Sequence, residues 1–341
     1  MAVTLLAGLV LAGCAGDAEP GATGAPEATS GESGTAGGSV EWRIALNQTA
    51  DHPITVSVQG MADRVNELTE GRVDIEVFPN ESLGAQAEAL QLVADGTIEL
   101  AIISGPQLEN MNTDFLVFNL PLVFDDIDHQ MSVVNDDEIV GDLYASLEDR
   151  NVSVLGAYTA GDRNIYTTDK PIVTPADTAG LKIRVQESET HLKMIELMGG
   201  SPTPMAFGEV YTALQSGVLD GAENNEVSYV SQRHVEVAPY FSYTRHLIVP
   251  DYLVASTSSL DELSAEDRAI FDEEFLASVE EQVALWATAT DEAIAAMEEA
   301  GVEFSDVDTS LFADAIAPLV DSSLTSDNAR AIYDATRAAA A

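Results

Sequence analysis

Short runs of apolar residues alternate with longer amphipathic stretches along most of the chain. Between the runs, apolar residues recur at three and four positions, as in Leu83, Ala87, Leu90 and Val93, which is the spacing of one helix face. Alternating strands and helices are typical of an α/β fold. Six runs are predicted as strands: 42–46, 73–78, 98–104, 152–158, 181–185 and 252–256.

Glycine follows several helical stretches directly before a strand. Gly71, Gly96 and Gly301 each stand between an amphipathic stretch and an apolar run. A glycine after a helix readily adopts the left-handed conformation that ends it. These three positions are therefore predicted helix ends.

One stretch of sequence is repeated in outline. Residues 92–101 (Leu-Val-Ala-Asp-Gly-Thr-Ile-Glu-Leu-Ala) align with residues 213–222 (Ala-Leu-Gln-Ser-Gly-Val-Leu-Asp-Gly-Ala). Both end a helix at glycine and begin a strand with an apolar–acidic pair. A unit that occurs once in each half predicts two similar lobes, and the interface between lobes is a favoured place for a ligand.

The longest helical pattern follows Ser264, where Ser-Ala-Glu-Asp resembles a capping box. Apolar residues recur from Ile270 to Met297, and one helix of roughly 35 residues would extend about 50 Å. Such a helix is longer than one lobe and would cross between lobes; two helices interrupted near 288–290 are the alternative. We expect lobe I over 40–160 and 250–289, and lobe II over 161–249 and 290–341.

The first 39 residues have a different character. Residues 1–13 form an apolar run too short to span a bilayer, which fits a signal peptide. The run ends in Leu-Ala-Gly-Cys14, which resembles a bacterial lipobox, whose cysteine carries a lipid; a generic signal peptide with an incidental cysteine is the alternative. Residues 15–39 contain no large apolar side chain, so a flexible tether is predicted there.

The charge of the chain excludes some partners. It contains 14 basic and 58 acidic residues, a formal net charge of −44. Nucleic acid would be repelled by such a surface. Only three of the basic residues are lysines, and an acidic, lysine-poor surface indicates salt tolerance. A single cysteine excludes an intramolecular disulfide and a cysteine-rich metal site.

Several motifs of enzyme chemistry are missing from the sequence. It contains no Gly-Lys-Ser/Thr or Gly-x-Gly-x-x-Gly loop for phosphate and no Gly-x-Ser-x-Gly nucleophile turn. None of its five histidines forms a His-x-x-x-His pair for a metal. A pair of carboxylates at catalytic distance stays open, although any one pair among 58 acidic residues carries almost no information. On these motifs we expect no catalytic residue, cofactor or metal.

Three segments carry polar residues where a strand or turn would be apolar. They are the segment 161–166 with Arg163, which follows the strand expected to end near Tyr158, the alternating strand 180–186 with Arg184, and the segment 220–225 with Asn224. A guanidinium binds a carboxylate through two parallel hydrogen bonds, and asparagine adds an uncharged donor and acceptor. Together they could form a site for an organic anion. The alternative is that both arginines pair with carboxylates of the protein itself.

These segments resemble a known family. Residues 180–185 and 199–225 are similar to the signature of the extracytoplasmic solute-binding subunits of tripartite ATP-independent periplasmic (TRAP) transporters. Phe78-Pro-Asn-Glu-Ser-Leu-Gly84 and Gly161-Asp-Arg-Asn resemble two further elements of that family, and the resemblance covers 42–335. It implies a two-lobe periplasmic-binding-protein-like fold with a ligand cleft between the lobes, a long helix spanning both, and a sodium-driven membrane permease as partner.

The resemblance also implies roles for individual residues. The carboxylate-binding arginine of the family falls on Arg184, its second arginine on Arg163 and its asparagine on Asn224. His52 is a candidate contact from the other lobe or an ordinary histidine in a surface turn. Phe207 lines the cleft or belongs to the core.

Two side-chain amides indicate which class of ligand the site would bind. Many relatives have proline after Glu-Asn, whereas this chain has Asn225. With Gln186, this resembles the branch that binds sugar acids such as hexuronates, because amides suit a ligand with several hydroxyls. A C4-dicarboxylate or another short carboxylate is the alternative. The expected protein is a monomeric, lipid-anchored, extracytoplasmic binding protein; a receptor ectodomain of the same fold and a secreted enzyme are the rival functions.

Overall fold

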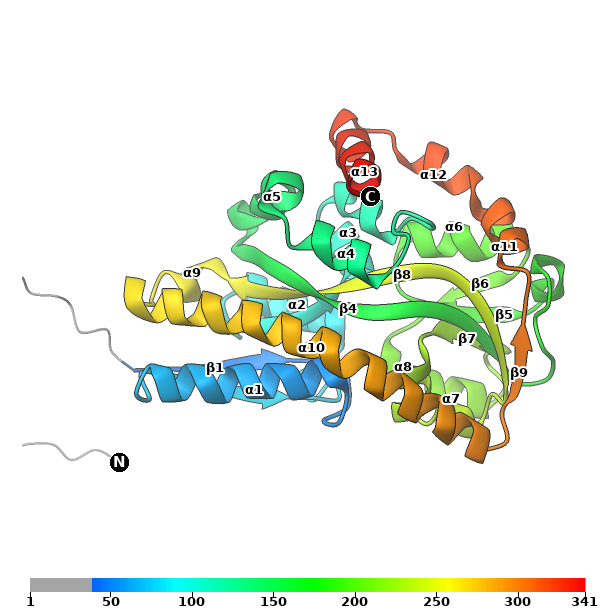
Figure 1. Ribbon diagram of the computed structural model, residues 1–341, viewed down its shortest axis with the longest axis horizontal. Helices are drawn as coiled ribbons and strands as arrows, with labels where there is room; N and C mark the ends of the chain where they lie inside the picture. The colour runs from blue at the N-terminus through cyan, green and yellow to red at the C-terminus, as the bar shows by residue number, and fades with distance from the viewer. Residues whose placement is uncertain (1–38, 341) are drawn as a thin grey trace, which may run out of the picture. The chain divides into compact units, whose positions relative to one another are not determined.

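The computed structural model describes residues 39–340 (Figure 1). The predicted signal peptide, Cys14 and nearly all of the predicted tether lie outside these residues. Among residues 39–340, no helix combines the length and the apolar character needed to cross a membrane.

Nine strands in the described residues form one mixed sheet, in the order β2-β1-β3-β8-β4-β7-β5-β6, with β9 beside β8. The strands are β1 (Val40–Ala45), β2 (Val73–Phe78), β3 (Leu100–Ser104), β4 (Val152–Thr167), β5 (Lys182–Val185), β6 (Ser201–Pro204), β7 (Gly221–Asn224), β8 (Tyr240–Ser256) and β9 (Glu303–Asp306).

Helices connect the strands and flank the sheet. The α-helices are α1 (Pro53–Leu68), α2 (Gln86–Ala94), α3 (Gly105–Glu109), α4 (Ile127–Val134), α5 (Asp137–Ala145), α6 (Glu189–Met198), α7 (Val210–Gln215), α8 (Glu226–Ser231), α9 (Thr257–Leu260), α10 (Ala265–Glu299), α11 (Thr309–Ile316), α12 (Pro318–Ser323) and α13 (Asp327–Ala339). Short 3₁₀ helices are η1 (Thr113–Asn119), η2 (Glu148–Arg150), η3 (Pro175–Thr178), η4 (Phe207–Glu209) and η5 (His234–Glu236).

The two halves of the sheet repeat one topology. β1 pairs in parallel with β2 and β3, and β5 pairs in parallel with β6 and β7. An antiparallel strand then follows in each half, β8 beside β3 and β4 beside β7. We call the part built on β1–β3 lobe I and the part built on β5–β7 lobe II. The predicted α/β fold with two similar lobes is therefore confirmed.

The repeated segment has the same backbone geometry in both lobes. After α2, the backbone amides of the two residues that follow Gly96 both donate to the carbonyl of Leu92. After α7, the backbone amides of the two residues that follow Gly217 donate to the carbonyl of Ala213 in the same way. Gly96 has φ 67° and Gly217 has φ 73°, the left-handed conformation that a side chain disfavours. The glycine-terminated helix ends predicted from sequence are present.

Two strands are much longer than predicted. The runs 152–158 and 252–256 are parts of β4 and β8, of 16 and 17 residues, which pair with each other through the centre of the sheet. β4 bulges around Gly161, whose φ is 64°. A Cβ at Gly161 would lie 2.6 Å from Trp286 of α10, so the close approach requires glycine. The strand end expected near Tyr158 is therefore wrong: Arg163 lies within the same strand beyond a bulge, and a bulge re-aims side chains.

The helix α10 is continuous over 35 residues, so the two-helix alternative is wrong. Ser264 caps it by accepting a hydrogen bond from the Asp267 amide. Ion pairs of Arg64 with Glu274 and of Arg72 with Asp267 join its first half to lobe I. Its second half packs on α8, which follows β7 (Figure 1). The helix spans both lobes, as predicted.

Apolar side chains cover both faces of the sheet. The neighbouring residues Ile102 and Ile103 of β3 belong to different core clusters, because successive strand residues point to opposite faces. The cluster that contains Ile102 lies under α1 and α10 and includes Phe271. The cluster that contains Ile103 also includes Ile183 of β5, so one core runs through both lobes.

The C-terminal helix α13 packs on η1, α4 and α5. The Ser326 hydroxyl donates to Asp114, and the His129 ring bonds to the Thr336 carbonyl. These contacts favour placing the end of the chain with residues 40–160, whereas the sequence assigned all of 290–341 to lobe II. The residue boundaries given for lobe I and lobe II in the sequence analysis stay a prediction.

Candidate functional site

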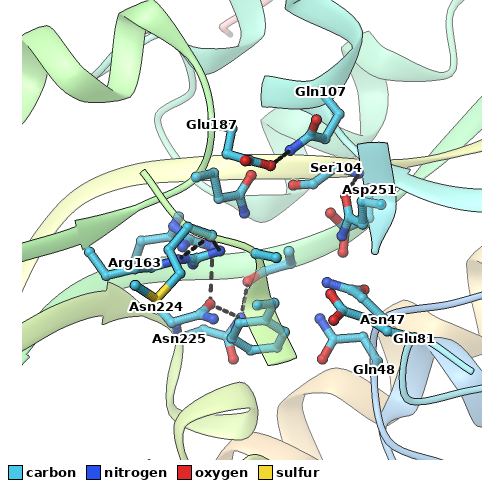
Figure 2. Close-up of a pocket in the computed structure, with 17 residues that line it drawn as sticks. Asn47, Gln48, Glu81, Ser104, Gln107, Arg163, Glu187, Asn224, Asn225 and Asp251 are labelled. Carbon is cyan, nitrogen blue, oxygen red and sulfur yellow. Dashed lines mark hydrogen bonds between the residues drawn. The ribbon is translucent and has the colours of Figure 1, made fainter. Parts of the chain in front are cut away.

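A pocket lies at the carboxyl ends of the parallel strands of both lobes (Figure 2). It holds about 490 Å³ free of protein atoms, including the part that opens to solvent. Ligands of α/β proteins commonly bind at this edge of a sheet. Lobe I contributes Asn47, Gln48, Glu81, Gln86, Ser104 and Gln107, lobe II contributes Arg184, Gln186, Glu187, Met205, Ala206, Phe207, Asn224 and Asn225, and the central strands contribute Ala160, Arg163 and Asp251.

The strand order brings the predicted polar residues together. Arg163 lies on β4, Asn224 on β7 and Arg184 on β5, which are three neighbouring strands. The structure thus joins three segments that are separate in the sequence.

Arg184 is buried, with 4 % of its surface exposed. Its Nε and Nη2 atoms donate to the Met205 carbonyl at 2.9 and 2.8 Å, and its guanidinium lies 5.5 Å from the centre of the Phe207 ring. Burial lowers the pKa of this guanidinium. Within residues 39–340, no carboxylate forms an ion pair with it. A buried cation without a counterion is costly, and a bound anion would offset that cost.

Arg163 has a different environment. Its Nε and Nη2 bind both carboxylate oxygens of Glu223, Nη2 also donates to the Glu223 carbonyl at 2.9 Å, and Nη1 donates to Asn224 Oδ1 at 3.0 Å. Burial by itself would raise the pKa of Glu223, but Arg163 and the nearby His246 ring, whose Nε2 lies 3.6 Å from Glu223 Oε2, hold that pKa below its usual value. The alternative that an arginine pairs with a carboxylate of the protein is therefore confirmed for Arg163 and wrong for Arg184.

Six of the seven predicted binding residues line the pocket: Arg184, Arg163, Asn224, Gln186, Asn225 and Phe207. The Asn225 side chain is engaged within the protein, because Oδ1 accepts from the Ser228 amide and Nδ2 donates to the Ala160 carbonyl, each at 2.7 Å. Phe207 both lines the pocket and belongs to the lobe II core.

His52 is not among the lining residues. Its Nδ1 accepts from the Ile54 amide at 3.3 Å as the cap of α1, and its Nε2 lies 3.4 Å from the Ser228 hydroxyl of α8. It is 1 % exposed. The sequence predicted either a ligand contact or a surface turn. The structure shows a buried cap that touches lobe II, because the turn before α1 faces α8.

Replacing His52 by asparagine should reduce the loss of stability in acid. Burial lowers the pKa of His52 from 6.5 to about 3. Between these values the unfolded chain binds a proton that the folded chain does not, so stability falls as the pH decreases through this range. The slope is at most about 1.4 kcal/mol per pH unit. Asparagine keeps an acceptor for the Ile54 amide but does not titrate. Urea unfolding at about pH 6.5 and 4.5 measures the difference; equal losses in both proteins would contradict the expectation.

Sequence reasoning missed the lobe I side of the pocket. Asn47 and Gln48 directly follow the first predicted strand, and polar residues at that position are a usable signal. Asp251 is an acidic residue directly before the apolar run 252–256, which proved to be the end of the longer strand β8. Glu81 lies inside the Phe-Pro element that carried the family resemblance. Across residues 39–340, no group of three or more His, Cys, Asp or Glu side chains is arranged to hold a metal.

Comparisons with known proteins identify the family of this chain. Residues 44–327 match the model of the bacterial extracellular solute-binding proteins, family 7. A solute-binding protein of Chromohalobacter salexigens is 37 % identical over 82 % of this chain and 83 % of its own length. A crystal structure of a TRAP periplasmic solute-binding protein from Anaerococcus prevotii, with bound D-glucuronate, is 40 % identical, covers 88 % of this chain and 97 % of its own, and has a TM-score of 0.85.

A second such structure comes from Sulfitobacter sp. NAS-14.1 and holds β-D-galacturonate. It is 33 % identical, covers 88 % of this chain and 100 % of its own, and has a TM-score of 0.84. These are binding proteins for transport, which confirms the resemblance found in the sequence. The chain therefore belongs to the bacterial extracellular solute-binding proteins of family 7, and it is an extracytoplasmic, TRAP-type solute-binding protein rather than an enzyme.

Proposed function

We propose that this protein captures a sugar acid of the hexuronate type and delivers it to a TRAP permease. The observation that carries the proposal is the guanidinium of Arg184, a buried cation that faces the pocket without a protein carboxylate. The hexuronates bound to the two crystal structures support the same class of ligand.

Arg184 is the proposed carboxylate anchor. Two of its five N–H groups bind Met205, which holds the fork in place and leaves Nη1 and one Nη2 hydrogen for the ligand. Arg163 keeps one Nη1 hydrogen beyond its bonds to Glu223 and Asn224. Asn224 accepts from Arg163 through Oδ1, so its amide NH₂ is oriented for a second contact with the ligand.

The remaining lining suits hydroxyl groups. Asn47 Oδ1, Gln48 Oε1 and Gln186 Oε1 are buried and have no hydrogen-bond partner within the protein. Buried acceptors are normally paired. The hydroxyls of a sugar acid would supply the donors, whereas a C4-dicarboxylate supplies few or none. This favours the sugar acid over the dicarboxylate alternative. A receptor ectodomain would carry the same pocket, and its own test is binding to a sensor kinase instead of a permease.

Contacts between the lobes close over the pocket. The Gly208 amide of lobe II donates to Glu81 Oε2 of lobe I at 3.1 Å, and Asn110 Nδ2 donates to the Glu187 carbonyl at 2.7 Å. We infer that the lobes hinge through β4 and β8 and form these contacts on closure. Exclusion of water then strengthens the ion pair of the ligand with Arg184.

We also propose that the mature chain is a monomer held at the membrane by a lipid on Cys14. The support is the sequence around Cys14 and the tether composition of 15–39. In cells, the wild type should partition with detergent and Cys14→Ser with the aqueous phase. Equal partition of both would contradict the anchor.

Thermal shift and calorimetry with the full chain test the ligand class. D-glucuronate and D-galacturonate should raise the melting temperature, because a ligand that binds only the folded form stabilises it. Glucose, which lacks the carboxylate, is the matched control and should give no shift. Stabilisation by malate or succinate without stabilisation by either hexuronate would overturn the sugar-acid proposal.

A further inference from the structure

Asp251 places a carboxylate in the wall of the pocket. It lies on the central strand β8, with Ser104 of β3 and Tyr158 of β4 as its register partners, and is 3 % exposed. Figure 2 shows Asp251, Ser104 and Asn47 across the pocket from Arg163 and Asn224. The neighbouring Ser104 hydroxyl has no hydrogen-bond partner within the described residues, and the charge of Arg163 reaches the Asp251 carboxylate. This carboxylate therefore retains unused capacity to accept hydrogen bonds.

The charged side chains that line the pocket differ in whether another group of the protein already pairs with them. Arg163 and Arg184 are its cations, and Arg163 is neutralised by Glu223. Three carboxylates, those of Glu81, Glu187 and Asp251, also line it. Glu81 accepts from Gly208, and Glu187 accepts from Gln107 at 3.4 Å, so both take part in contacts between the lobes. Arg184 is the cation that forms no ion pair within the described residues, although the charges of Glu223 and Glu81 reach it, and Asp251 is the carboxylate left free of contacts between the lobes.

A ligand with two carboxylates would therefore be poorly matched. Its first carboxylate can pair with Arg184, but its second has no free cation and meets Asp251 across the pocket. Like charges that are desolvated together repel strongly. A hydroxyl at the same place would instead donate to Asp251, and a hydrogen bond to a charged acceptor is among the stronger ones.

We propose that Asp251 determines specificity: it accepts hydrogen bonds from hydroxyls at the end of the ligand remote from Arg184, and it excludes acids that carry a second carboxylate there. This inference rests on the proposed function and deepens it. The chosen ligands are acids with one carboxylate and several hydroxyls. Neighbouring amide oxygens of Asn47 and Gln48 extend the same acceptor surface.

A matched pair of ligands tests the inference on the wild type. D-glucuronate and D-glucarate share one carbon chain, but D-glucarate carries a carboxylate at both ends. Calorimetry at pH 8 is suitable because burial raises the pKa of Asp251 to about 6, which leaves it ionised at that pH. We expect D-glucuronate to bind at least about tenfold more tightly. Equal affinity, or tighter binding of D-glucarate, overturns the role of Asp251 and leaves organic-acid capture intact.

The variant Asp251→Asn keeps the shape of the side chain and removes its charge. This variant should bind D-glucuronate about tenfold or more weakly than the wild type, and its preference for D-glucuronate over D-glucarate should be smaller. The control Asp272→Asn on α10 removes one exposed carboxylate and should change neither the affinity nor the preference. An unchanged preference in Asp251→Asn overturns the inference. If the variant fails to fold, the wild-type ligand pair still decides. Absence of binding by any acid overturns the proposed function and the inference with it.

Discussion

Arg184→Ala should weaken binding of the organic acid by more than tenfold. Two N–H groups of Arg184 donate to the Met205 carbonyl, and the guanidinium lines the pocket. The variant therefore loses both the positive charge and a guanidinium whose orientation is already fixed. A factor of ten corresponds to about 1.4 kcal/mol, which is modest for an ion pair removed from water. Calorimetry with D-glucuronate measures the loss.

Two controls separate the anchor from general effects of charge. Arg184→Lys keeps the positive charge but replaces the planar fork by a point charge, so an intermediate affinity is expected. Arg268→Ala removes an exposed arginine of α10 that pairs with Asp272, and it should leave affinity unchanged. Unchanged binding in Arg184→Ala would reject Arg184 as the anchor.

Glu223→Gln should destabilise the folded protein by about 3–5 kcal/mol, because it leaves a buried guanidinium without its counterion. Arg163 is 2 % exposed and Glu223 is fully buried. Their pairing stabilises lobe II, since it joins β4 to β7, and it orients Asn224 at the pocket. Urea unfolding followed by circular dichroism measures the change.

The exposed pair Arg268–Asp272 provides the comparison. Asp272→Asn breaks it and should cost at most about 1 kcal/mol, as is usual for exposed ion pairs. Removing both members of the buried pair, as Arg163→Met with Glu223→Leu, should cost less than Glu223→Gln by itself, because no charge then remains buried. Equal losses in Glu223→Gln and Asp272→Asn would show that the buried pair has no special importance.

Periodicity predicted the short strands well and the long strands poorly. The run 73–78 coincides with β2, because a strand with one buried face alternates cleanly. β4 and β8 were cut short because Arg163, Asn164 and His246 interrupt the apolar pattern in their middle. Arg163 bonds to Glu223 of β7 and Asn164 accepts from the Arg245 amide of β8, whereas His246 bonds to Thr244 of its own strand. Partners on another strand are not visible in a local window of sequence.

The candidate site was predicted unevenly for a similar reason. Among 58 acidic residues, local pattern gave no reason to expect a protein carboxylate beside Arg163 and not beside Arg184; the family resemblance alone pointed to Arg184 as the carboxylate-binding arginine. Only the folded chain selects Glu223 as the partner of Arg163. The acceptors of lobe I, Asn47 and Asp251 among them, became recognisable when the strands that carry them were placed around one pocket.

The amino-acid sequence by itself determined the α/β class, the repeated helix–strand unit, the long crossing helix and the family, because these depend on spacing and on short motifs along the chain. The tertiary structure decided which arginine has no ion pair within the protein, that His52 caps a helix instead of facing the pocket, and that the carboxylate of Asp251 lines the pocket. Those outcomes depend on which residues distant in the sequence come within hydrogen-bonding distance, and burial gives these contacts their energy.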